Sequence, residues 1–316
     1  MPLRVGMKTM YDSMLYQLNN LTESTRKLQT QIASGVKYEK PSDAPVDLVR
    51  ALGYRKSLEE IDRYQTSIRE GKAYLRTMEG AYQGLEDIVT RAKQLAIQAR
   101  NSTMSPANRE AIAKEVDSLL SEALALANTR HGNRYVFGGD KPTGYEDGHP
   151  PFELIKEALP NGEVKEYVVY RGGEEDMDFS YSPDGKLLIG RNGREAIMTS
   201  GIFDTLIGLK KTLEADNQSD PHRELEELGV HIDRLDKVLT HLTNERAALG
   251  ARMDHLDLKS NLYDDLKTTI KENLSDAQDA DLLEVATRLK AKETAYQAAL
   301  AATAKVMNLS LVNYLS

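Results

Sequence analysis

Apolar residues repeat every seven positions along two long stretches of the chain, a pattern typical of paired helices. In the first stretch the repeat consists of Tyr54, Ile61, Ile68, Leu75, Tyr82, Val89 and Ala96. In the second stretch it consists of Leu228, Leu235, Leu242, Leu249, Leu256, Tyr263, Ile270 and Ala277. A period of seven keeps one apolar seam facing a neighbouring helix while the two helices supercoil. The pattern therefore predicts long helices that pair along their length.

A shorter helix is predicted between these two, with Ser105 as its N-cap and Pro106 at its first position. Its inward face is predicted to carry Ile112, Val116, Leu119, Ala123 and Leu126. The first long helix, from about Pro45 to Asn101, would be ~85 Å long at 1.5 Å per residue. A compact globule of this chain length is only about 50 Å across. We therefore expect a rod in which these helices form a bundle.

Both ends of the chain read as further amphipathic helices with spacings of seven. From Thr294 onward Lys305 is the only charged residue, so a lone exposed helix would leave much apolar surface in water. Two interpretations stay open: the ends pair with each other within one chain, or they pack into an assembly of several chains. The candidate assembly interface consists of Met7, Met14, Leu18, Leu21, Leu28, Ile32, Leu282, Leu289, Tyr296, Leu300, Met307 and Leu311.

Residues 140–204 have a different composition from the rest of the chain. They carry 14 acidic and 7 basic side chains, so this segment holds nearly all of the net charge of −8. Apolar and polar residues alternate over 163–171 and 177–181, and Pro183 and Gly185 mark a hairpin turn between strands. The four phenylalanines lie in or beside this segment and predict a small β core: Phe137, Phe152, Phe179 and Phe203. We predict a β-rich domain inserted in a helical protein.

The predicted organisation has three parts. Residues 1–45 and 275–316 form a terminal coiled-coil assembly region. Residues 46–139 and 205–274 form a helical rod, and the inserted β-rich segment forms an outer domain. The expected fold class is mainly α, an elongated antiparallel helical bundle with a small β-rich insert.

Composition excludes several classes of protein. The chain of 316 residues has no Cys and no Trp, which excludes a disulfide framework, a cysteine zinc site and a thiol nucleophile. The negative charge argues against a protein that coats nucleic acid. No stretch approaches the roughly 18 apolar residues that cross a bilayer. The first residues lack a basic segment followed by an apolar one, so no cleaved signal peptide is expected.

No residue pattern indicates catalysis, a metal or a cofactor. The chain lacks the HExxH, GxSxG and GxxxxGK[ST] motifs. His231 and His241 point to different sides of a helix, and we expect the histidines to lie on solvated surfaces. The acidic run from Glu174 to Asp178 lacks the spacing of a calcium loop and is interpreted as a solvated loop. We therefore predict that the protein is not an enzyme.

Three segments of the chain resemble the bacterial flagellin superfamily. In residues 28–46, Ile32 to Gly35 lead into the acidic loop from Lys40 to Ala44, as in the N-terminal signature of the family. A second motif of the family is matched by Arg91, Leu95, Gln98, Ala99, Asn101, Arg109, Ile112, Glu115 and Leu119. Residues 275–281 and the Ala-rich helix after them resemble its closing segment. Ala44 departs from the family pattern, which often has a second Asp there.

Within the superfamily, three segments resemble hook-associated members more than filament flagellins: residues 41–45, 133–139 and 307–316. This resemblance implies a structural adaptor at the hook–filament junction, outside the cell in the flagellum and exported by the flagellar type III route. The implied partners are neighbouring copies in a ring, another hook-associated protein, flagellin, and an export chaperone at the C-terminal helix, with no nucleic acid and no membrane insertion. The alternatives are a filament flagellin with a short variable domain, an adhesive surface-binding module, and an enzyme hosted in the insert.

Overall fold

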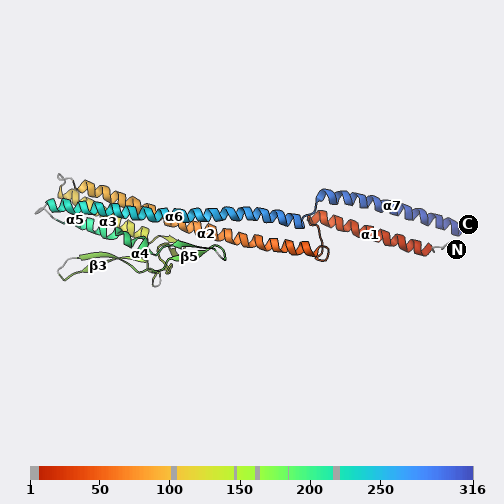
Figure 1. Cartoon of the computed structure of the whole chain (residues 1–316), viewed down its shortest axis with the longest axis horizontal. Coiled ribbons are helices and arrows are strands. Elements are labelled where there is room, and N and C mark those ends of the chain that lie inside the picture. The colour runs from red at the N-terminus through yellow and green to blue at the C-terminus, as the bar shows by residue number, and fades with distance from the viewer. Residues whose placement is uncertain are drawn as a thin grey trace. The chain divides into compact units, whose positions relative to one another are not determined.

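The computed structural model describes residues 7–100, 105–145, 148–160, 164–183, 185–215 and 221–315 (Figure 1). Within these ranges, the side chains of residues 7, 8, 221, 222 and 306–315 are not described. The chain divides into two compact units. One unit comprises residues 1–61 and 264–316, and the other comprises residues 62–263.

The described residues are mainly helical, with small antiparallel sheets, as the expected fold class requires. The helices are α1 (Met7–Ser34), α2 (Pro45–Ala99), α3 (Pro106–Ala127), α4 (Gly193–Ala196), a 3₁₀ turn (Met198–Ser200), α5 (Ile202–Glu214), α6 (Pro221–Gln278) and α7 (Leu282–Leu315). The strands are β1 (Arg130–His131), β2 (Arg134–Tyr135), β3 (Phe152–Ala158), β4 (Val164–Tyr170), β5 (Met177–Ser180) and β6 (Lys186–Gly190). Within the described residues the strands pair as separate antiparallel hairpins, β1 with β2, β3 with β4 and β5 with β6.

The predicted seams of the two long helices are confirmed. On α2 the heptad residues from Ile61 to Ala96 are all buried, and so are those on α6 from Leu228 to Leu256. Ion pairs join the two helices beside this seam, between Lys93 and Asp236 and between Lys72 and Asp257. Partner numbers rise on one helix as they fall on the other, so α2 and α6 run antiparallel in the unit of residues 62–263.

Helix α3 begins where the sequence predicts. The Ser105 side chain accepts a hydrogen bond from the Asn108 amide at 3.3 Å, and Pro106 occupies the first helical position. Near this end of the helix, Arg109 donates to the carboxylate of Glu224 at 2.6 Å. Glu224 is buried. The sequence around it gives no sign of this, because Glu224 is one of several acidic residues on a polar helix. A buried ion pair of this kind needs both partners, because either one alone would leave an uncompensated charge.

The predicted hairpin between residues 177 and 190 is confirmed as β5–β6, but the phenylalanines do not form a β core of their own. Phe152 on β3 lies against Phe203 on α5, with ring centroids 5.9 Å apart. Phe137 packs edge-on against Tyr82 of α2 at 5.2 Å. These rings belong to the same buried cluster as the helix seams. A two-stranded sheet cannot bury its own face, so each hairpin packs on helices instead.

One histidine also departs from the expectation of solvated side chains. His231 is buried between α6 and α5, and its Nε2 lies 3.1 Å from the Thr212 hydroxyl. Gly208 faces the ring, and a Cβ at that position would come within 2.7 Å of it. The ring therefore occupies a space that a glycine leaves open, which the spacing of histidines along the chain does not reveal.

Candidate assembly interface

Helices α1 and α7 lie side by side in the unit formed by residues 1–61 and 264–316 (Figure 1). Six residues of the candidate interface are half-buried: Met14, Leu18, Leu21, Leu28, Leu289 and Tyr296. Three others remain exposed, namely Ile32, Leu282 and Leu300. Met7, Met307 and Leu311 belong to α1 and α7, but their side chains lie outside the described ones. The two ends therefore pair with each other within one chain, as in the first of the two interpretations.

This pair buries little apolar surface. Among the described side chains of α1 and α7, only Val285 is fully buried. Two helices shield only the stripe where they meet, so the flanks of each apolar face stay in water. A fully buried Leu or Met contributes about 1.5–3 kcal/mol, and a half-buried one contributes correspondingly less. The terminal pair is thus held much more weakly than a seam of buried leucines.

The apolar face of α1 is wider than the part that α7 covers. Met10, Tyr11, Leu15 and Tyr16 are all exposed, and Tyr16 keeps 69% of its surface in water. Met10 and Tyr11 precede Met14 by four and three positions, and Leu15 precedes Leu18 by three, so these three residues extend the same face of the helix, whereas Tyr16 lies on another side. Contiguous exposed apolar surface of this kind is rare on monomers and typical of a protein interface.

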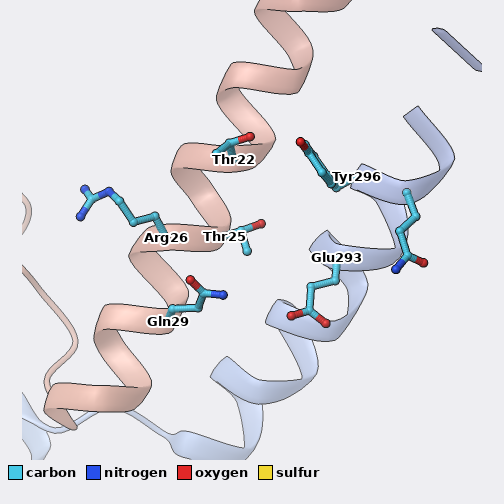
Figure 2. Close-up of a pocket in the computed structure, with 7 residues that line it drawn as sticks. Thr22, Thr25, Arg26, Gln29, Glu293 and Tyr296 are labelled. Atoms are coloured by element: carbon cyan, nitrogen blue, oxygen red, sulfur yellow. The ribbon is translucent and has the colours of Figure 1, made fainter. Parts of the chain in front are cut away.

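A groove of about 690 Å³ runs between the two helices near their middle (Figure 2). It is lined by Thr22, Thr25, Arg26, Gln29, Glu293, Tyr296 and Gln297. Figure 2 shows Thr22, Thr25 and Tyr296 directed into the gap between the helices, whereas the guanidinium of Arg26 points away from α7. The hydroxyl, amide and carboxylate groups of this lining leave room for a side chain of another element to pack between them. They provide no paired acid and base for catalysis.

Backbone hydrogen bonds fix the base of the terminal pair. The Ala280 amide donates to the Gly35 carbonyl, and the Lys37 amide donates to the Gln278 carbonyl, both at 2.8 Å. Gly35 ends α1 with a φ of +70°, which glycine adopts without strain. Two segments more than 200 residues apart in the sequence thereby form one short ladder, which sets the register of α1 against α7.

The acidic loop noted in the sequence is built as a turn. The Lys40 amide donates to the Asp43 carboxylate at 3.0 Å, and this hydrogen bond holds the pKa of Asp43 below its ordinary value. Arg26 reaches down from α1 to Glu39 at 3.0 Å, and that hydrogen bond likewise lowers the pKa of Glu39. Both carboxylates are engaged by the chain itself, so the motif shapes the entry to α2.

Neither a metal site nor a membrane span is found in the ranges given above. Over those residues, no group of three or more His, Asp or Glu side chains could hold a metal ion. The described helices also contain no segment long and apolar enough to cross a membrane.

Two family models match the chain at the elements described here. The N-terminal helical region of bacterial flagellin matches residues 5–141, and the C-terminal helical region of bacterial flagellin matches residues 232–315. The chain therefore belongs to the bacterial flagellin family. This confirms the resemblance inferred from the three sequence segments.

The chain is similar in sequence to curated hook-associated proteins, and its fold is similar to several solved structures. The chain is 23% identical over 328 residues to flagellar hook-associated protein 3 of Escherichia coli, and 22% identical over 333 residues to the same-named protein of Salmonella typhimurium. Both alignments cover 98% of each chain. The fold is similar to FlgL of Bacillus cereus (TM-score 0.57, 22% identity, 71% of this chain and 99% of that one). It is also similar to the junction protein FlgL of Legionella pneumophila (TM-score 0.58, 15% identity, 72% and 99%).

Sequence reasoning missed a group of exposed apolar residues at the start of α2. Val46, Val49 and Leu52 are all exposed, and none of them was part of the candidate interface. Their spacing of three could have been noticed, but the same helix carries a second apolar face that dominates the pattern.

Proposed function

We propose that this chain is a structural subunit of the bacterial flagellum, an adaptor at the junction between hook and filament, and not an enzyme. The observation that carries the proposal is the terminal pair, whose apolar faces are only half covered within one chain. Alignment with the two hook-associated relatives over 98% of each chain supports the position at the junction. Hook-associated protein 3 is the name of those relatives, and the adaptor role is inferred from them.

In the proposed mechanism, assembly completes the burial that the single chain leaves unfinished. Covering the exposed half of a Leu, Met or Tyr side chain contributes about 1 kcal/mol. Over the candidate interface these contributions offset the entropy lost when the helices become fixed between neighbours. The interface comprises Met7, Met14, Leu18, Leu21, Leu28, Ile32, Leu282, Leu289, Tyr296, Leu300, Met307 and Leu311. The terminal helices thus act as the assembly region, and the insert of residues 140–204 forms an outer part.

The proposed partners follow from the position at the junction. Neighbouring copies of the chain would form a ring, with another hook-associated protein on one side and flagellin on the other. An export chaperone would cover α7 before export, because that helix is rich in apolar residues and poor in charge near its end. The proposed location is the flagellum outside the cell, reached by the flagellar type III export route.

The test is complementation of a strain that lacks this gene. Tyr11→Glu places a charge on the exposed apolar face of α1, and Asn20→Glu adds the same charge at a polar exposed position on the other side of the same helix. We expect both proteins to show the same helical circular dichroism, while only Tyr11→Glu loses motility and releases unassembled flagellin into the medium. Full motility with Tyr11→Glu in combination with Met10→Glu would contradict the proposed interface.

The same strain separates the competing functions. A filament flagellin would polymerise by itself into long filaments after purification, and its loss would leave cells without filament protein. An adhesive module would leave swimming intact and reduce only attachment to surfaces. Either result would overturn the junction role.

A further inference from the structure

The first turns of α2 carry apolar residues on two opposite faces. Ala51 and Ile61 are buried on one face. Val46, Val49 and Leu52 recur every three residues and lie about 180° away around the helix. They are 62%, 69% and 53% exposed, so nothing among the described residues of this unit covers them. We refer to Val46, Val49 and Leu52 as the α2 stripe.

Positive charge surrounds the α2 stripe. Residues 45–56 carry three basic side chains and one acidic side chain, and one of the basic ones, Arg55, donates to the Gln278 side chain at 2.6 Å. Arg50 forms a long, exposed ion pair with Asp47 at 3.8 Å, which is weak. Lys56 projects from the same face as Val49 and has no ion-pair partner among the described residues. The stripe is therefore an apolar surface with a basic rim.

A second exposed apolar surface lies in the same unit, at the corner between α6 and α7. Leu282 is exposed, and Leu283 keeps 80% of its surface in water. Residues 276–284 contain four acidic side chains and no basic one. The Asp281 carboxylate accepts hydrogen bonds from the amides of Leu283 and Glu284 at 3.0 and 3.1 Å, which fixes the first turn of α7. Glu284 is paired with Arg288 of the same helix at 2.6 Å, so the acidic rim consists of Asp276, Asp279 and Asp281. We refer to Leu282 and Leu283 as the α7 corner, an apolar surface with this acidic rim.

The charges decide which of these surfaces can meet between copies. Contact of two α2 stripes would oppose basic rims, and contact of two α7 corners would oppose acidic rims. Only a contact between one stripe and one corner brings opposite charges together. In Figure 1 the first turns of α2 and of α7 lie on opposite sides of the end of α1.

We infer that the α2 stripe of one copy docks on the α7 corner of a neighbouring copy, in a head-to-tail contact. Such a contact uses two different patches and generates a ring when the rotation between copies closes. The inference rests on the proposed function, because it takes copies of this chain to be neighbours in the flagellum. It adds the particular surfaces and their direction, neither of which belongs to the packing of α1 against α7.

Cysteine cross-linking tests this contact, because the chain has no Cys of its own. Val49→Cys and Leu283→Cys are expressed as two separate chains in a strain that lacks the wild-type gene. Isolated flagella are then treated with a short bismaleimide. We expect a covalent dimer only when both variants are present. Each variant alone should give monomer, and so should Val49→Cys together with Ala298→Cys, an exposed control position on the same helix α7 outside the candidate interface.

Charge reversal supplies a second readout on the same dimer. Lys56→Glu should lower the cross-linking yield by at least about threefold, since it replaces an exposed attraction by repulsion. Asp276→Lys in the partner chain should restore the yield, because Asp276 is an exposed acid of the α7 corner.

The failures are distinguishable. Motile cells whose flagella contain both variants without a mixed dimer would overturn the head-to-tail contact and leave the junction role intact. Dimers formed by Val49→Cys alone would do the same. Absence of the chain from isolated flagella would overturn the proposed function, and the inference with it.

Discussion

Leu256 and Leu258 form a matched pair for measuring what holds the long helices together. Both lie in α6, two positions apart, and substitution by Ala deletes the same atoms and changes helix propensity equally. Leu256 has 0% of its surface exposed, whereas Leu258 has 67%. Any difference between the two variants therefore reports burial at the seam.

The expected difference follows from the cost of a cavity. Replacing a buried Leu by Ala costs about 2–5 kcal/mol, depending on how far the neighbours close the gap. We expect about 3 kcal/mol for Leu256→Ala, because helices of a bundle can shift slightly toward each other. Leu258→Ala should change stability by less than about 0.5 kcal/mol, as is usual for surface substitutions.

Urea unfolding followed by circular dichroism gives the overall change, and amide hydrogen exchange of residues 249–263 gives the local one. The local opening equilibrium should differ between the two variants by between about tenfold and a hundredfold. Equal losses in the two variants, or no loss in Leu256→Ala, would refute the view that the heptad seam carries the stability of this unit.

Three further predictions concern buried polar groups in the unit of residues 62–263. Burial lowers the pKa of His231, with Arg234 acting in the same direction and Glu227 against it. As the pH falls below about 6.5, His231 takes up a proton in the unfolded chain but stays neutral in the folded chain. The free energy of unfolding therefore falls as the pH drops below that value. His231→Gln should flatten this loss in urea midpoints measured at pH 7.5 and 5.5. Arg109→Met should cost about 3–5 kcal/mol in thermal unfolding by stranding the Glu224 carboxylate, and adding Glu224→Leu should recover most of it. Asn192 caps α4 through the amide of residue 195 at 2.9 Å, so Asn192→Ala should cost about 1–2 kcal/mol, while Asn192→Ser should lose less in the same assay.

The two units differ in how completely they bury their apolar faces, and this difference bears on function. Residues such as Leu242 and Leu85 are fully enclosed in the unit of residues 62–263. Leu21 and Leu289 of the terminal pair are only half-buried. A subunit that must first exist alone and then join others needs one part that folds by itself and one part that neighbours complete. The exposed surfaces on α1, α2 and α7 are where that completion is proposed.

The sequence by itself determined the elements and the inward face of the long helices. Heptad spacing predicted the seams of α2 and α6, Ser105 and Pro106 predicted the start of α3, and Pro183 with Gly185 predicted the β5–β6 hairpin. These features depend on interactions between residues close together in the chain, such as helix periodicity, capping and turn preferences. Local pattern is therefore sufficient to find them.

Only the tertiary structure decided what each apolar or polar face meets. Phe203 looked like part of a β core but packs from α5 against Phe152, and His231 looked solvated but fills the space beside Gly208. The start of α2 is apolar on both sides, and no local rule tells which side finds a partner within the chain. Burial is a property of elements brought together from distant parts of the sequence. The α2 stripe thus became visible only when the packed face on the other side of the helix was known.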